Sequence, residues 1–165
     1  MTEQRQMRKQ GRRSGHAVIE VALLAPWIFF LFVGVLDFGF FAYAAIATQN
    51  AARAAALYTS SDKDTADKWQ EVCRDVVLEE LNALPNVRGL GAADCVNSPS
   101  AIDTTHPVAV TAQLVDNTSS PPSADGAMAT RVGVTYQSLP MIPIPGLMMH
   151  QYRLTRVVEM RVRED

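Results

Sequence analysis

The longest apolar run in the chain extends from Val21 to Leu36 and contains no charged residue. Glu20 stands immediately before this run and Asp37 immediately after it. Counted from His16, about 21 residues precede Asp37, and an α-helix of that length spans roughly 30 Å, the thickness of the hydrocarbon core of a bilayer. The pattern therefore predicts a transmembrane helix over residues 16–37.

Residues 38–60 continue the helical pattern beyond the apolar run. Alanine, the best helix former, is frequent in this stretch and proline is absent. The polar interruptions are Asn50 and Arg53, and Arg53 is either a solvated charge or the partner of an acidic neighbour. The sequence TSSD at residues 59–62 is typical of a helix end followed by a new N-cap. We therefore expect the same helix to extend to about Tyr58.

Residues 61–165 have the pattern of a small α+β domain. Apolar residues at helical spacing predict a second helix from about Asp64 to Leu84. Alternating apolar and polar residues predict three strands, and consecutive strands favour an antiparallel meander with one face against helices. Arg156 interrupts the apolar row of the last strand, so we expect it at a sheet margin or snorkelling outward. The strands are predicted at Val108–Val115, Met128–Leu139 and Gln151–Arg163.

Charge is distributed unevenly on the two sides of the apolar run. Residues 1–14 carry five basic side chains and Glu3, a net charge of +4, whereas the chain from Phe38 onward has 10 basic and 14 acidic side chains, a net charge of −4. The positive-inside bias therefore predicts that the basic leader, residues 1–15, stays in the cytoplasm and that the domain is exported. A basic run beside an apolar helix is more typical of a topology signal than of a nucleic-acid site.

Three interpretations of residues 1–37 compete. A secretory signal peptide has an apolar core of about 7–15 residues and a cleavage site with small side chains. The apolar run here is longer, and the bulky sequence DFGFF follows it, although Ala42-Tyr43-Ala44 lies further on and would suit cleavage. The other two interpretations are a plain membrane anchor and a short leader that is removed ahead of the helix.

Glu20 favours the removable leader. An ionisable group in a membrane helix is unfavourable by roughly 3 kcal/mol at the bilayer centre, and by less near the interface, so it needs a partner or a polar exit. Cleavage after Gly15 would give His16 a new α-amino group one helical turn from Glu20. In a filament, the carboxylate could instead pair with the amine of a neighbouring subunit and set the axial register of the helices.

These residues also resemble a known family. The sequence RRSGHAVIE at residues 12–20, followed by ALLAP at 22–26, is similar to the start of the TadE-like pseudopilins of the tight-adherence (Tad/Flp) pilus system. The likeness continues through Asp37-Phe38-Gly39, where the family usually has Glu-Phe-Gly, and through QNAARAAA at 49–56. It departs from the family at Asp37 and at Val21, which replaces an aromatic residue common in relatives.

The resemblance implies a pilin-like fold, in which a long N-terminal transmembrane helix continues into a small α+β domain. It also implies a minor pilin or pseudopilin of the bacterial inner membrane, with the C-terminal domain in the periplasm. Gly15 and His16 would flank the bond cut by a prepilin peptidase, and Glu20 would serve subunit assembly. The implied partners are this peptidase, membrane lipids, other pilins and the proteins of the pilus assembly platform.

Three further residues have candidate structural roles. Cys73 and Cys95 fall on the predicted exported side, where a disulfide between them would close a loop of about 22 residues and contribute on the order of 3 kcal/mol. The alternative is two unrelated small buried residues. Pro26 lies inside the helical run, removes one backbone hydrogen bond and should kink the helix.

Sequence motifs for catalysis are missing. There is no GxSxG, HExxH, P-loop or dinucleotide fingerprint, and the three histidines are scattered without metal-like spacing. We therefore expect no enzyme activity, no catalytic residue, no cofactor, no metal, no small-molecule substrate and no nucleic acid.

Three classes of function remain, and the first two are favoured over the third. The first is a minor pilin or pseudopilin that initiates or caps a tight-adherence type IVb pilus used in surface adhesion or secretion. The alternative is a single-pass, membrane-anchored periplasmic binding or envelope domain that does not polymerise and needs no role for Glu20. The third is a secreted ligand-binding protein released by cleavage near Ala44.

Overall fold

The computed structural model describes residues 3–139 and 151–163 of the chain, with side chains described from His16 onward. By its internal contacts the chain divides into two compact units, Met1–Phe40 and Phe41–Asp165. The division falls within the first helix, so that helix contributes one part to each unit. The second unit contains all the strands and is the folded domain.

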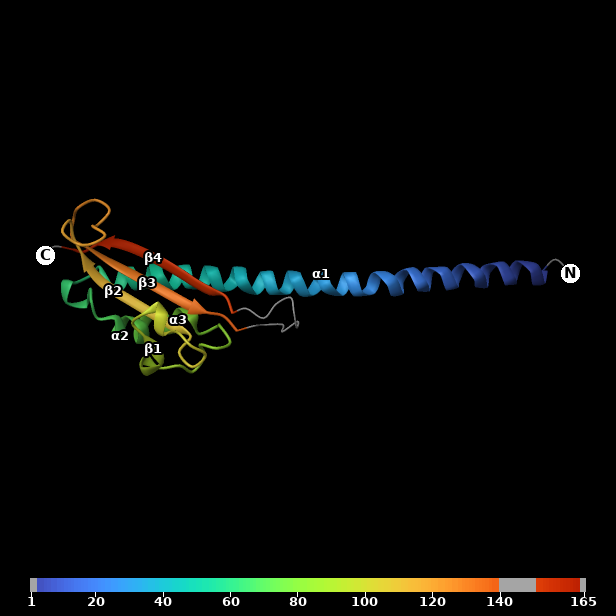
Figure 1. Cartoon of the computed structure of the whole chain (residues 1–165), viewed down its shortest axis with the longest axis horizontal. Coiled ribbons are helices and arrows are strands. Elements are labelled where there is room, and N and C mark those ends of the chain that lie inside the picture. Colours follow the sequence, from blue (N-terminus) through green and yellow to red (C-terminus); the bar gives the residue numbers. More distant parts are fainter. Residues whose placement is uncertain (1–2, 140–150, 164–165) are drawn as a thin grey trace. The chain divides into compact units, whose positions relative to one another are not determined.

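Helix α1 extends from Glu3 to Thr59 and includes both the apolar run and the alanine-rich stretch (Figure 1). Its end agrees with the predicted stop near Tyr58. The Thr59 hydroxyl donates back to the carbonyl of Ala55 at 3.0 Å, and the Ser60 amide donates to the carbonyl of Ala56 at 3.0 Å. The Ser60 and Ser61 hydroxyls donate to the carbonyls of Leu57 and Tyr58, at 2.9 and 2.7 Å, and so satisfy carbonyls that the last helical turn leaves free.

The second helix is shorter than predicted. It consists of α2 (Trp69–Val72), a π-helical turn (Cys73–Val77) and α3 (Leu78–Leu81), which follow one another without a break. The predicted start near Asp64 instead forms a separate 3₁₀ turn, where the Asp62 carboxylate accepts the amide of Asp64 at 3.3 Å. The predicted apolar face is buried at the positions of Val72, Cys73, Val77, Leu81 and Leu84.

The sheet has four strands in the order β1-β2-β3-β4. The three long strands form the predicted antiparallel meander, with Val110 opposite Val134 and Val134 opposite Arg156. A short fourth strand, which the sequence pattern did not indicate, pairs parallel to β2 and makes the sheet mixed. The strands are β1 (Cys95–Val96), β2 (Val108–Val115), β3 (Ala129–Gln137) and β4 (Arg153–Arg161).

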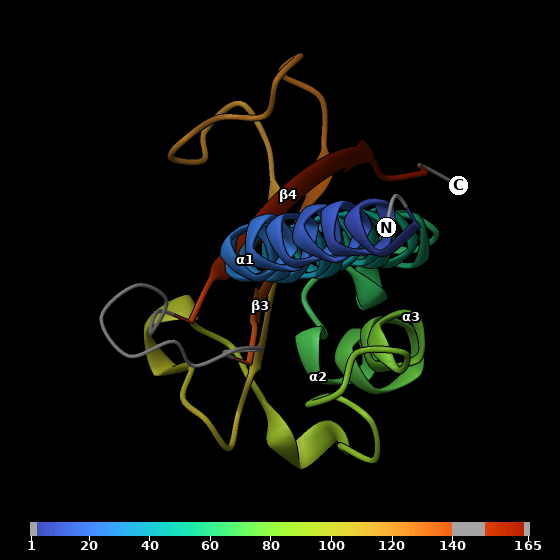
Figure 2. The same ribbon diagram turned by 90° about the vertical axis from the view of Figure 1, so that its right-hand side faces the viewer.

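The core of the domain lies between the sheet, the second helix and the part of α1 that belongs to this unit. In Figure 2, α2 and α3 lie on one side of β3. The sheet contributes fully buried valines and Tyr136, and α1 contributes small side chains. Gly133 in β3 stands opposite Thr111 in β2, and a Cβ there would lie 2.6 Å from the Thr111 hydroxyl oxygen. Glycine at position 133 therefore leaves room for the side chain of Thr111 on the neighbouring strand.

Candidate assembly and anchoring site

The apolar part of α1 exposes nearly all of its large side chains, and Val33 is the buried exception among them. From Trp27 to Phe32, six consecutive residues are between 54% and 72% exposed. Consecutive residues of a helix point about 100° apart, so no single face of this segment is covered. Each such side chain gains roughly 1.5–3 kcal/mol when it leaves water. The segment is therefore suited to hydrocarbon or to other helices, and His16–Thr59 is the candidate membrane span among the described residues.

Acidic residues bracket this apolar segment in the structure as in the sequence. Glu20 is exposed and Asp37 is half-buried, and neither has an ion-pair partner within the described part of the chain. His16 is exposed within α1, and the Gly15 backbone belongs to the same helix. The roles predicted for Gly15, His16 and Glu20 require a peptidase or a neighbouring subunit, so they stay predictions.

Pro26 lies inside α1, and the helix continues on both sides of it. Proline has no amide hydrogen, so one backbone carbonyl in the preceding turn loses its helical donor. Such a position is tolerated in a membrane helix because neighbouring helices can satisfy the freed carbonyl. The kink expected at Pro26 remains a prediction.

The domain part of α1 buries a face made almost entirely of small residues. Thr130 of β3 donates a hydrogen bond to the hydroxyl oxygen of Thr59 at 2.9 Å, and the Arg163 amide donates to the carbonyl of Ser60 at 3.1 Å. Small side chains permit close approach, so the sheet can be fixed to the end of α1 by direct hydrogen bonds. The buried small residues are Ala44, Thr48, Ala51, Ala52, Ala55, Ala56 and Thr59.

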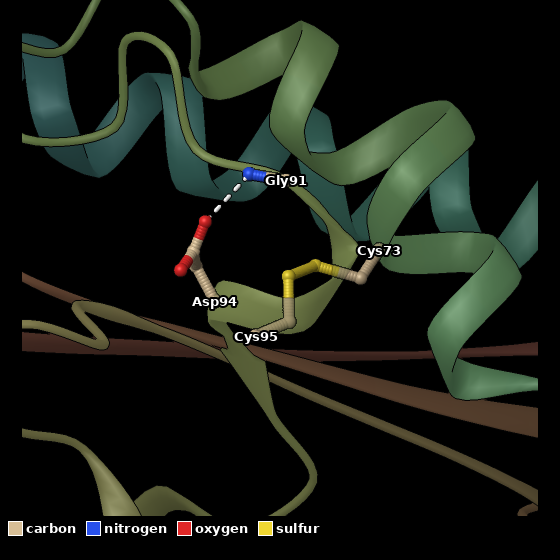
Figure 3. Close-up of a disulfide and its surroundings, with 4 residues drawn as sticks. All are labelled: Cys73, Gly91, Asp94 and Cys95. Carbon is tan, nitrogen blue, oxygen red and sulfur yellow. Dashed lines mark hydrogen bonds between the residues drawn. A yellow bond between two sulfur atoms is a disulfide. The ribbon is translucent and has the colours of Figure 1, made fainter.

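A disulfide joins Cys73 of the second helix to Cys95 at the start of β1 (Figure 3). Both residues are buried, with Cys73 fully covered. Next to the bond, the Asp94 carboxylate accepts the Gly91 amide at 2.8 Å and closes the turn that leads into β1. The bond links two elements that are otherwise separated by a long loop, and it accounts for the position of the short strand.

The loops at the ends of the sheet are held by polar side chains. Arg131 and Glu159 stand opposite each other on β3 and β4 and form an ion pair at 3.0 Å. Arg131 also donates to the carbonyls of Pro121 and Pro122, at 3.0 and 2.8 Å. The pair therefore secures the loop between β2 and β3.

Elsewhere, hydrogen bonds from the Thr105 hydroxyl and from the His106 backbone hold the pKa of Asp103 below its usual range.

Asn86 connects the end of the second helix to the sheet. Its side-chain oxygen accepts the Tyr136 hydroxyl at 2.6 Å, and its amide nitrogen donates to the carbonyl of Gln137 at 2.8 Å. Burial raises the pKa of Tyr136 to about 12, because the phenolate would lose its hydration. Sequence patterns do not reveal this contact, since the two residues lie far apart in the chain.

A shallow hollow of about 340 Å³ lies between α1 and β4. Two basic residues, Arg53 of α1 and Arg156 of β4, line it together with Gln49 and Asn50. Because β4 is an edge strand, Arg156 is exposed at the sheet margin, as predicted. Arg156 donates to the carbonyl of Thr155 at 3.0 Å, and neither arginine has an acidic partner among the described residues.

The described residues contain no group of three or more His, Cys, Asp or Glu side chains that could hold a metal ion. The hollow at Arg53 and Arg156 combines cationic groups with amides, which suits the binding of a carboxylate rather than a bond-making step. Two kinds of side chain lack a partner among the described residues. Most of the large apolar side chains of α1 are exposed, and the charged side chains of Asp37, Arg53 and Arg156 have no ion pair.

These features define a class of protein: a pilin-like α+β domain carried by a single long apolar helix that suits a single-pass membrane anchor. Residues 15–57 match the model of the TadE-like protein family, in agreement with the resemblance seen in the sequence. The family is generally not enzymatic. No curated protein and no solved structure matches the chain.

Proposed function

We propose that this protein is a minor pilin or pseudopilin that takes part in initiating or capping a tight-adherence pilus. The observation that carries the proposal is the coincidence of the TadE-like match with a helix whose apolar side chains from Val18 to Phe32 are exposed on all sides. The chain is consistent with a Tad pilus component, and the family implies Tad partners in general. A role in assembly explains why a small domain carries a helix with both an apolar surface and two acidic residues.

The proposed topology has four parts. Residues 1–15 form a cytoplasmic basic leader, 16–37 cross the inner membrane, 38–60 extend the helix, and 61–165 form the periplasmic domain. The net charge of +4 before the apolar segment supports this orientation, since basic residues near a membrane helix are retained in the cytoplasm. The Cys73–Cys95 disulfide supports it as well, because such bonds persist in oxidising compartments.

Processing after Gly15 is the first part of the proposal to test. The family match begins at Gly15, and His16 would become the new N-terminus. We expect intact-mass measurement on protein purified from its native host to give a mature chain that starts at His16. A functional chain that still carries residues 1–15 would contradict processing and would favour the plain anchor.

The role of Glu20 in assembly is the second part of the proposal to test. In the proposed assembly its carboxylate pairs with the α-amino group of His16, either of its own chain or of a neighbour, inside an apolar environment. We expect Glu20→Ala to reduce pilus yield by about tenfold or more, because removing one partner leaves a charge unpaired in a poorly hydrated site. Asp67→Ala, which removes an exposed acid of the domain, is the matched control and should leave the yield unchanged.

Recovery of partners separates this proposal from a non-polymerising periplasmic domain. A tagged full-length chain, extracted in mild detergent from its host, is expected to co-purify with other pilins and with proteins of the assembly platform. Recovery of the chain alone, together with normal pilus yield for Glu20→Ala, would favour the anchored domain.

A further inference from the structure

The domain part of α1 has a narrow exposed stripe with regular spacing. Between Phe41 and Thr59, all the exposed residues are separated alternately by three and four positions, and the apolar ones among them are between 49% and 62% exposed. This is the spacing of a helix that packs along a second helix. We call these five residues the α1 stripe: Tyr43, Ile46, Asn50, Arg53 and Leu57.

The α1 stripe is apolar at both ends and polar in the middle. Arg53 belongs both to the stripe and to the hollow that it shares with Arg156. Both arginines line this hollow without an acidic partner in the described residues, so a carboxylate that enters it can pair with two cationic groups. The stripe therefore suits a helix that is apolar with a single acid at the matching position.

The same chain contains a helical segment with this pattern. Asp37 is the acid within it, flanked by large apolar residues, and it has no cationic partner in the described residues. Asp37 and Arg53 are far beyond the three- or four-residue spacing at which side chains of one helix meet, so they cannot pair within one chain. With the spacing of the α1 stripe, the residues around Asp37 are Trp27, Phe30, Gly34, Asp37 and Phe41. Trp27 and Phe30 are exposed, whereas Gly34, Asp37 and Phe41 are half-buried and the Phe41 ring packs edge-on against Tyr152 of the same chain.

We propose that the α1 stripe of one copy packs parallel to residues 27–41 of a second copy, and that Asp37 of the second copy binds between Arg53 and Arg156 of the first. This proposal rests on the proposed function and specifies its contact surface. Parallel helices in this register are offset by about sixteen residues, or ~24 Å at the rise of an α-helix, so the contact belongs to the assembled state, in which residues 27–37 of the second copy have left the bilayer. The facing pairs are Tyr43 with Trp27, Ile46 with Phe30, Asn50 with Gly34, Arg53 with Asp37, and Leu57 with Phe41.

Packing favours this register. Gly34 has no atom of the described residues within 4 Å of the place where a Cβ would stand, so a side chain as large as Asn50 can approach the helix there. A polar residue at one such position fixes the register of a helix pair, because any shift leaves it facing an apolar neighbour. The acids Glu79 and Glu80 of α3 are less suitable partners, since the apolar residues beside them, Leu78 and Leu81, are buried and leave no exposed apolar row to face the α1 stripe.

The contact is head-to-tail, because each copy contributes two different surfaces. One copy uses its α1 stripe and the next uses residues 27–41, so both copies keep one surface free for a further neighbour. A contact of this kind continues into an open chain of subunits unless its rotation closes a ring. The geometry of the contact thus suits addition of subunits one at a time along an axis.

Paired cysteines test the register directly. Two full-length copies with different tags are co-expressed in the native host, one with Asp37→Cys and the other with Arg53→Cys, and both retain the native Cys73–Cys95 pair. We expect a disulfide-linked species that carries both tags. Gln49→Cys and Leu57→Cys, each one turn away from Arg53 on α1, are the register controls and should cross-link to Asp37→Cys at least about fivefold less.

Charge reversal is the second measurement. We expect Asp37→Arg to reduce co-purification of two tagged copies by about tenfold or more, because three cationic groups then meet. Reversing the hollow as well, with Arg53→Glu and Arg156→Glu, should restore it. Arg88→Glu, a reversal outside the hollow, should give no rescue.

The outcomes separate this contact from the proposed function. Equal cross-linking at the register controls, or no rescue by the reversed hollow, would overturn the contact. If Tad pilus proteins are still recovered in that case, the proposed function stands without it. If the specific cross-link forms while no pilus protein is recovered, the contact between copies stands and the proposed function fails.

Discussion

The two parts of α1 differ in what surrounds them, although both are helical and rich in apolar residues. In the first part, the side chains from Val18 to Phe32 are exposed on every face. In the second part, alanines and threonines form one buried face against the domain, and the exposed face is the narrow α1 stripe. The first part therefore depends on an environment outside the chain, whereas the second is stabilised by packing within it.

This difference shows how residue size assigns a helix to its environment. Large apolar side chains all round a helix are favourable in hydrocarbon and unfavourable in water. Small side chains on one face allow a sheet to approach the helix closely enough for Thr130 to reach Thr59. Four changes would break or sharpen the comparison, and we give them from the largest expected effect to the smallest.

The largest effect is expected from a charge in the first part of α1. Leu31→Lys should oppose membrane insertion by roughly 3–4 kcal/mol, because a lysine near the helix centre must be dehydrated. The stability of the domain should not change, since Leu31 is 70% exposed and belongs to the other unit. Carbonate extraction of membranes measures the first effect, and proteolysis of the domain measures the second. Unfolding of the domain in this variant would contradict the separation of the two parts.

Loss of the disulfide should affect the domain and not membrane association, which is the reverse of the result expected for Leu31→Lys. Cys73→Ser with Cys95→Ser should lower the free energy of unfolding of the domain by about 3 kcal/mol, because the unfolded chain regains the freedom of the closed loop. Membrane association should be unchanged. Thermal unfolding of the full chain in detergent, with and without a reductant, checks this result. A reductant that destabilises the double variant as much as the unmodified chain would show that the bond is not responsible.

Replacing an alanine by leucine should have different effects in the two parts of α1. Ala55→Leu should destabilise the domain by about 1–3 kcal/mol, since Ala55 is fully buried and the sheet would have to move. Ala22→Leu adds the same atoms to an exposed position of the first part and should have no effect on domain stability. Thermal unfolding of the two variants side by side gives the comparison. Equal stability would mean that α1 does not pack as closely as the buried alanines indicate.

The smallest effect is expected from pH, and only in the domain. The pKa of Tyr136 is about 12 in the folded chain and near 10 in the unfolded chain, so its contribution to stability is complete below pH 10 and is lost as pH rises toward 12. Tyr136→Phe should remove this part of the decline. At neutral pH the variant should be less stable by about 1 kcal/mol, because Asn86 loses its hydrogen bond. Chemical denaturation at a series of pH values checks both statements.

Local patterns in the sequence determined the apolar helix, its extension and the three long strands. Val108–Val115 was predicted with the bounds that β2 has, because alternation over eight residues depends only on neighbouring positions. The apolar face of the second helix was predicted for the same reason. Its start was not, because Asp62 caps a separate 3₁₀ turn and the helix begins only at Trp69.

Contacts between distant residues were decided only by the tertiary structure. The two-residue strand β1 has no pattern of its own: Cys95 is joined to the second helix, and the backbone of β1 pairs with β2. The contact of Asn86 with Tyr136 and the hollow lined by Arg53 and Arg156 likewise depend on how the sheet lies against the helices of its own domain. Periodicity along a chain records which face of an element is apolar, but it contains no information on which polar groups of two elements meet.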